Sequence, residues 1–441
     1  MTSANKPSPT ITERRYVVPL VLVTSLFFLW AIGVNLNDIL IQHFKKAFGL
    51  TDSGSSLIQV AFFGGYCLAA LPAGWLMQRV GYKRGILIGL LVCSTGTILF
   101  IPAASVRIYG FFLFALFLMA CGQSVLEVAA NPYVTTLGPA DSSERRLNLA
   151  QSFNAAGAVM IALVGSRFIL SGIEHTPAEI AAMSPAQLLV YRASEANMVK
   201  TPYLVITGVF LFVALLIFLT KLPEIRETST DGPTTSSTKL SGTLAFPHLI
   251  KGVLAQFFYV GAQVGVGSFI IRFTEFTLPG VHEKDAAHYL QAHLAGFMIG
   301  RFAGSAIMQK VAAPRLLSLF AGGSLLCLLV VLFASGAAPV WAIVLIGFFH
   351  SIMFPTIFAL SLKSLGPYTK LGSSLLVMAI IGGAVCPAIM GRISDAWNIQ
   401  HAFIVPLVCH AYVFYFAVWG YRPAAVASAS TPIAIPATEV E

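Results

Sequence analysis

The chain has 441 residues, of which 57% are hydrophobic and only 10% are charged, and its mean hydropathy is +0.81. Soluble globular proteins carry about 25% charged residues, so this composition excludes a soluble domain and indicates an integral membrane protein. The net charge of +9 does not indicate a nucleic-acid partner, because basic residues in membrane proteins mostly set the topology.

The first predicted membrane helix, residues 16–43, carries polar side chains in its second half. Asn35 and Asp38 are three positions apart and therefore share a helix face, with Trp30 roughly aligned one turn earlier. An ionised Asp in hydrocarbon costs at least about 2.5–3.5 kcal/mol on insertion scales, so such a residue is normally kept for function. This face therefore predicts a site for a proton and a polyhydroxylated ligand.

Apolar runs of spanning length recur along the chain, separated by short polar loops. The twelve predicted spans are residues 16–43, 55–78, 84–102, 108–136, 147–171, 201–220, 247–275, 286–309, 315–335, 338–362, 371–391 and 402–420. A polar stretch rich in Ser, Thr and Pro separates the sixth span from the seventh and is typical of a flexible linker. We predict an all-α membrane protein with twelve transmembrane helices in two six-helix bundles, at 1–222 and 247–441, joined by a cytoplasmic linker at 223–246.

The distribution of basic residues predicts the orientation. More than half of the 27 Lys and Arg residues fall in loops that are cytoplasmic when the N-terminus lies inside. We therefore expect a multi-pass protein of a bacterial cytoplasmic (inner) membrane with both termini in the cytoplasm. A weak repeat, residues 73–80 against 303–311, ends the second span of each half and supports two parallel repeats.

The sequence contains no motif that indicates an enzyme. None of its six cysteines lies in a metal-binding spacing, and it shows no phosphate loop, nucleophile elbow or zinc motif. We therefore predict no catalytic residue, no metal and no cofactor, with the proton as the coupling ion.

Two further polar faces lie deep in the N-terminal half. Gln123, Glu127 and Asn131 follow one another at intervals of four residues along one stripe of the fourth span, and Gln151 and Asn154 are three apart in the fifth. Buried amides also join helices in membranes, so each Asn or Gln alone is equally compatible with a structural role. A carboxylate suits that role less well, which favours a functional role for Glu127.

Two carboxylates in one cavity of low dielectric constant cannot both stay ionised without cost, because desolvation and like charge each favour the protonated form. A proton-coupled carrier requires such a group, which takes up the driving proton on one side and releases it on the other. An ionised carboxylate also accepts hydrogen bonds from sugar hydroxyls more strongly than an amide does. Asp38 and Glu127 are the predicted proton-coupling residues.

The C-terminal half is more apolar at its centre. Gln256 and Gln263 are seven residues apart on one face of the seventh span. Two other polar residues keep open roles. His350 in the tenth span is compatible with packing or with a proton relay, and Arg301 in the eighth is compatible with pairing to a carboxylate of the other half or with a structural role.

Several motifs together resemble the major facilitator superfamily and, within it, the L-fucose:proton symporter (L-fucose permease) family. They are FFLW at 27–30, NLNDIL at 35–40, LEVAANP at 126–132, RLNLAQSFN at 146–154, LAQFFYVGAQ at 254–263, PTIF at 355–358 and GSS at 372–374. The long loop at 172–200 also resembles the L-fucose permease family more than it resembles the shorter glucose/galactose members. The chain departs from the pattern at 264–269, and at Phe354, where we expect a Tyr in the family.

The resemblance implies a role for each matching residue. Asp38 matches the carboxylate implicated in proton coupling, and Glu127 matches the one implicated in sugar recognition and the coupled protonation cycle. With the polar residues above, the predicted substrate-binding set is Glu127, Gln151, Asn154, Asn35, Trp30, Asn131, Gln256 and Gln263.

These observations predict a symporter that takes up a monosaccharide together with a proton by alternating access. L-fucose is the favoured substrate, with galactose, glucose or mannose as the alternatives. A proton-driven drug exporter is less favoured, because it would need a large aromatic cavity with fewer amides. The expected partners are the sugar, the proton and the lipid bilayer, with a monomer as the functional unit.

Overall fold

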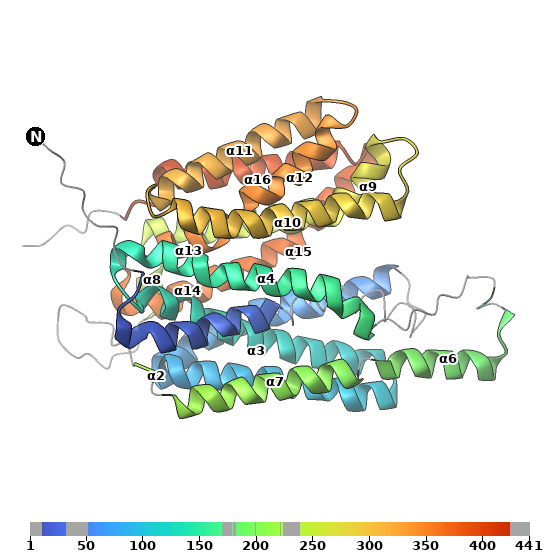
Figure 1. The fold of residues 1–441 in the computed structure, drawn as a ribbon, viewed down its shortest axis with the longest axis horizontal. Coiled ribbons are helices and arrows are strands. Elements are labelled where there is room, and N and C mark those ends of the chain that lie inside the picture. Colours follow the sequence, from blue (N-terminus) through green and yellow to red (C-terminus); the bar gives the residue numbers. More distant parts are fainter. Residues whose placement is uncertain are drawn as a thin grey trace, which may run out of the picture.

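The computed structural model describes residues 11–31, 52–169, 179, 182–198, 200–220, 222–223 and 239–423. Within these ranges all regular structure is helical. Figure 1 shows two groups of long helices lying side by side, one from the first half of the chain (blue to green) and one from the second half (yellow to red).

The first group, which we call the N-terminal bundle, contains a helix over residues 17–31 and the following elements: α2 (Asp52–Val106), α3 (Tyr109–Thr136), α4 (Ser143–Ile169), α6 (Pro185–Met198) and α7 (Lys200–Leu219). The second group, the C-terminal bundle, contains α9 (Pro247–Thr277), α10 (Glu283–Ile307), α11 (Ala313–Phe333), α12 (Ala338–His350), α13 (Met353–Leu362), α14 (Thr369–Met378), α15 (Gly382–Ala396) and α16 (Ile404–Tyr415). The short elements are α8 (Leu240–Thr243), the 3-10 helices η1 (Arg14–Tyr16), η2 (Ala140–Ser142), η3 (Gly366–Tyr368), η4 (Ala379–Ile381) and η5 (His401–Phe403), and a π-helical turn, η6 (Phe416–Gly420).

The described helices account for the predicted spans. Nine stretches of the described residues are long and apolar enough to cross a membrane. One of them, in α2, holds two predicted spans, because Gly81 has a φ of +79° and an α-helix cannot continue through it. With α4 and α10 added, each of the twelve predicted spans has a helical counterpart, although the first is described only to residue 31.

Two of the predicted spans are broken in their middle. The span predicted at 338–362 consists of α12 and α13, with a turn between them. Pro355 accounts for this break, since it has no N–H to bond the carbonyl of Ser351 and its ring clashes with a preceding helical turn. The next span consists of α14 and α15, joined by η4 just before Gly382 and Gly383. Helix breaks at membrane depth are tolerated only where protein or water satisfies the freed backbone groups.

The bundles touch most closely at one end, which we call the terminal end because residues 11–16 and 421–423 lie there. Ser373 of α14 donates to the carbonyl oxygen of Val128 in α3 at 3.0 Å. A Cβ atom on Gly74 of α2 would lie 2.1 Å from Oγ of Ser374 and 3.2 Å from Leu371, so only glycine permits this approach.

Polar contacts between α4 and α13 close the same end. Nδ2 of Asn148 donates to the hydroxyl of Thr356 at 3.1 Å, and Lys363 forms an ion pair with Glu144. The described structure is therefore packed shut between the bundles at the terminal end.

Candidate functional site

The predicted site residues divide into those the structure describes and those it does not. Asn35 and Asp38 lie outside the described residues. The described ones gather around the stripe of α3 that carries Glu127, whose side chain is only 3% exposed. Gln123 and Asn131, one turn before and one turn after it, are fully buried. The spacing in the sequence therefore places three buried polar groups in one row.

A relay of hydrogen bonds reaches this row from the C-terminal bundle. Nη1 of Arg301, in α10, donates to Oε1 of Gln151 at 3.0 Å and to its backbone carbonyl at 2.5 Å. Nε2 of Gln151 donates in turn to Oδ1 of Asn131 at 3.1 Å. Because a guanidinium only donates, it fixes the orientation of both amides. Nδ2 of Asn131 is a buried donor that lies beyond strict hydrogen-bonding distance of the other described atoms, and its side chain interacts with the carboxylate of Glu127.

A second relay reaches the row from the first helix. Nε1 of Trp30 donates to the hydroxyl of Tyr66 at 3.1 Å, and this hydroxyl donates to Oε1 of Gln123 at 3.3 Å. Ser124 holds the same segment by donating to the backbone carbonyl of Tyr66. Nε2 of Gln123 is then a second buried donor, and it has no partner among the described atoms.

The two relays give Glu127 a defined setting. The amide donors of Gln123 and Asn131 flank the carboxylate, one turn away on each side; the Asn131 side chain interacts with Glu127, and the Gln123 donor has no partner among the described atoms. Arg301 interacts with Glu127 electrostatically, yet the two form no direct ion pair in the described structure. The carboxylate can thus accept hydrogen bonds from a ligand, while the amides donate to the ligand's oxygens. A group with adjacent hydroxyls satisfies both kinds of atom.

Trp30 takes part in one of the two relays, whereas Asn154 takes part in neither. The Trp30 ring stacks on Phe27, with centroids 5.4 Å apart and planes 24° apart, and its N–H is used in the second relay. Nδ2 of Asn154 donates to the backbone carbonyl of Phe27 at 3.0 Å. In this structure Asn154 therefore holds the first helix against α4 and does not join the relay through Gln151.

The two glutamines of α9 stand apart from both relays. Gln256 is fully buried, and neither atom of its amide has a hydrogen-bond partner among the described residues. Gln263 is half-buried, two turns later on the same helix. Their spacing placed them on one face, but no described hydrogen bond links either of them to the row on α3.

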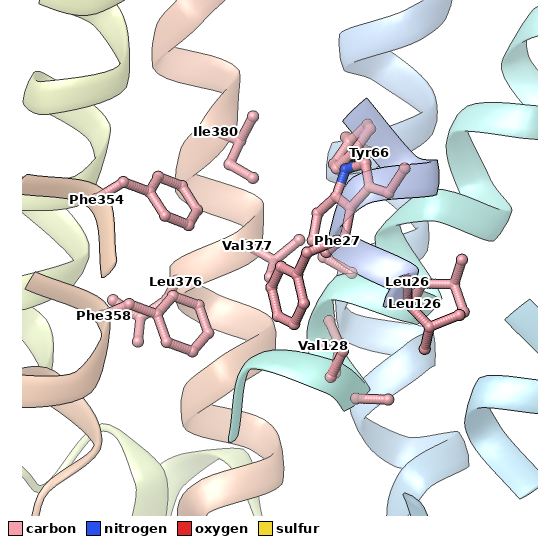
Figure 2. Packing of buried hydrophobic residues seen from close by; sticks show 14 of the residues in the cluster. Leu26, Phe27, Tyr66, Leu126, Val128, Phe354, Phe358, Leu376, Val377 and Ile380 are labelled. Atoms are coloured by element: carbon pink, nitrogen blue, oxygen red, sulfur yellow. Dashed lines mark hydrogen bonds between the residues drawn. The ribbon is translucent and has the colours of Figure 1, made fainter. Parts of the chain in front are cut away.

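The C-terminal bundle presents an apolar wall, which we define as Phe354, Phe358, Val377 and Ile380. Phe354 and Phe358 stack with centroids 6.1 Å apart. Figure 2 shows Phe354 and Phe358 on the opposite side from Tyr66 and Phe27, with Val377 and Ile380 lying between these two pairs. The prediction of a more apolar C-terminal half matches this packing.

The sequence patterns did not identify two of the residues that hold the site together. Tyr66 was one aromatic residue among many, and only its contacts distinguish it. Arg301 had an open role, although an arginine between two glycines within a predicted membrane helix is itself a signal of a polar partner. Its partner, Gln151, is 150 positions away in the chain, which no local pattern reveals.

Comparison with known proteins agrees with this architecture. Residues 22–375 match the Major Facilitator Superfamily. The chain is 44% identical to the L-fucose-proton symporter of Escherichia coli (strain K12), over 92% of this chain and 93% of that protein. It is 41% identical to a glucose/galactose transporter of Brucella abortus, over 94% of this chain and 96% of that protein. The chain belongs to the L-fucose:proton symporter family of the major facilitator superfamily.

Solved structures show the same relationship. The chain matches the crystal structure of FucP, a major facilitator transporter in the outward conformation, with a TM-score of 0.85 and 43% identity. The match covers 92% of this chain and 99% of FucP. The proton:xylose symporter XylE shares the fold, with a TM-score of 0.70 at 11% identity.

Proposed function

We propose that this protein carries a monosaccharide across the membrane together with a proton, by alternating access. The observation that carries the proposal is the buried carboxylate of Glu127 between two oriented amide donors. Sugars offer neighbouring hydroxyls that can donate to the carboxylate and accept from the amides. The relatives named as sugar transporters support the same assignment.

Protonation of Glu127 would change both halves of the site. In the ionised state the carboxylate attracts Arg301 and accepts hydrogen bonds from the sugar. Once protonated it loses its charge, and the attraction between α3 and α10 weakens. Uptake of the proton would thereby favour separation of the bundles where Arg301 now meets Gln151. By the family resemblance, Asp38 would be the second group in this proton cycle.

The orientation in the membrane rests on charge. The terminal end carries most of the described basic residues, at helix ends and helix breaks, among them Lys83, Arg145, Arg146, Lys363 and Lys370. By the positive-inside rule this end would face the cytoplasm, with both termini there. The described state would then be closed to the cytoplasm, in agreement with the match to FucP in its outward conformation. A bacterial inner membrane, a monomer as the functional unit and no cofactor complete the proposal.

L-fucose is the substrate that this site favours. It is a 6-deoxy sugar, so its C6 is a methyl group, while its ring hydroxyls can face Glu127 and the amides. The apolar wall of Phe354, Phe358, Val377 and Ile380 suits a methyl group, and it would leave a hydroxyl at C6 without a partner. The 44% identity to the E. coli L-fucose-proton symporter points the same way.

Glucose or galactose is the second candidate, favoured by the 41% identity to the Brucella glucose/galactose transporter. Proteoliposomes that contain the purified chain distinguish the two. We expect labelled L-fucose to enter under an inward proton gradient, and unlabelled L-galactose, which differs only by a hydroxyl at C6, to compete at least tenfold more weakly. Stronger competition by D-galactose and D-glucose than by L-fucose would assign the second candidate. No uptake of any of these sugars would refute the proposal.

A further inference from the structure

A pair of histidines lies in the C-terminal bundle, apart from both relays. His350 is the last residue of α12 and His410 lies in α16, and both side chains are 0% exposed. Their Nε2 atoms are 2.9 Å apart. The rings are within 3° of parallel and their centroids are 4.9 Å apart, so the rings meet edge to edge through these two nitrogens.

The contacts define where the protons lie in the neutral pair. Nδ1 of His410 is 2.8 Å from the carbonyl oxygen of Pro406, which can only accept, so this nitrogen carries a proton. Nε2 of neutral His410 is then an acceptor, and Nε2 of His350 must donate to it. Nδ1 of His350 is left as a buried acceptor with no partner among the described residues. The pair therefore has one vacant place for a proton.

The groups that face the pair provide no counter-charge. From α9, the hydroxyl of Tyr259 donates to the backbone carbonyl of His350 at 2.9 Å. From α10, the ring of His293 lies 6.1 Å from that of His350, and its Nδ1 bonds the carbonyl of Ile343. The packed helices α11, α12, α13 and α16 contain no carboxylate. The carboxylates of α9, α10 and α15 lie near the ends of these helices: Glu275, Glu283, Asp285 and the exposed Asp395. Arg301 of α10 interacts electrostatically with Tyr259, and its charge is positive.

The pair is also placed at a hinge. α12 ends at His350 and α13 begins at Met353. Because of this break, the backbone carbonyl of His350 loses its hydrogen bond within the helix, and it accepts one from the hydroxyl of Tyr259 instead. Beyond the break, α13 carries Thr356 and is followed directly by Lys363, and these two residues hold α4 at the terminal end. A displacement at His350 would therefore reach the contacts that close the bundles.

We propose that His350 and His410 form a one-proton binding site that controls the position of α13. Binding of the proton places a positive charge, shared by two imidazoles, in a buried apolar hinge without a carboxylate. That charge is costly unless water enters or the helices separate. Acidification therefore favours an arrangement in which α13 moves away from α4.

Nitrogen NMR of the full chain in lipid nanodiscs tests the site directly. The chain has nine histidines, and labelling them with ¹⁵N reports the protonation of each ring nitrogen as the pH is lowered. We expect two rings to change together, with one proton taken up between them, and His410→Asn to abolish the shared transition. His293→Gln is the control that keeps it. Independent titration of His350 and His410, or neutrality of both down to the pH at which the fold is lost, would overturn the proposal.

Hydrogen exchange of residues 351–362 tests the link to α13. After correction for the intrinsic effect of pH, we expect exchange in this segment to rise at least tenfold at acid pH in the wild type, and not in His410→Asn. If that variant does not fold, His350→Asn serves the same purpose. Acid-dependent exchange that persists in a folded variant would contradict the link. Neither experiment uses a sugar or measures transport, so its failure is distinct from failure of the proposed function.

Discussion

Replacing Arg301 by Met removes the only described link between the C-terminal bundle and the relay that ends at Asn131. Met keeps similar length and apolar bulk, so the change removes mainly the charge and the two hydrogen bonds to Gln151. A hydrogen bond to a charged group contributes about 1.5–3 kcal/mol, and a buried acceptor left without its donor costs a similar amount. The Gln151 amide can then turn over, and the donor of Asn131 beside Glu127 loses its fixed orientation.

Equilibrium binding of the transported sugar to purified protein measures this effect. Loss of about 1.5–3 kcal/mol corresponds to affinity that is weaker by roughly ten- to a hundredfold. Arg392→Met is the matched control, because Arg392 is an exposed arginine on α15 of the same bundle. Affinity of Arg301→Met within twofold of the control, in a folded protein, would refute the role of the relay in ordering the site.

Two further predictions concern closure and coupling. Gly74→Leu adds a side chain where a Cβ atom alone would lie 2.1 Å from Oγ of Ser374. Overpacking of this kind costs about 1–3 kcal/mol, so we expect the terminal end to open. Cysteines introduced at that end should then react at least tenfold faster with a thiol reagent. Gly64→Leu, on the same helix with nothing within 4 Å, should leave the rate unchanged, and equal rates in both variants would contradict the closure. Asp38→Asn should abolish accumulation driven by a proton gradient while sugar exchange persists, and normal concentrative uptake would remove Asp38 from the proton cycle.

Local patterns in the sequence predicted the parts of the site that lie on single helices. The four-residue spacing of Gln123, Glu127 and Asn131 predicted one polar row on α3, and the structure shows all three buried there. The spans themselves followed from hydropathy, because a bilayer demands long apolar helices. Family resemblance supplied the role of Asp38, which lies outside the described residues and stays a prediction.

Contacts between distant parts of the chain could not be predicted in the same way. Arg301 meets Gln151 across the boundary between the bundles, and nothing in either helix specifies the other. The edge-to-edge contact of His350 with His410 depends on a helix break, and its signal, Pro355, is compatible with a kinked continuous helix as well. The spacing of Asn154 from Gln151 predicted that both amides share one face of α4. The amide of Asn154 nevertheless donates to the backbone carbonyl of Phe27 and does not join the relay through Gln151.

The proton dependence of sugar uptake by Glu127→Gln tests the central claim most directly. Gln has nearly the same shape as Glu but cannot take up or release a proton. In proteoliposomes, the account predicts that the wild type accumulates sugar when the outside is made acidic, whereas Glu127→Gln equilibrates sugar at most and does not respond to the proton gradient. Accumulation by Glu127→Gln equal to that of the wild type, with the same dependence on the gradient, would contradict the account.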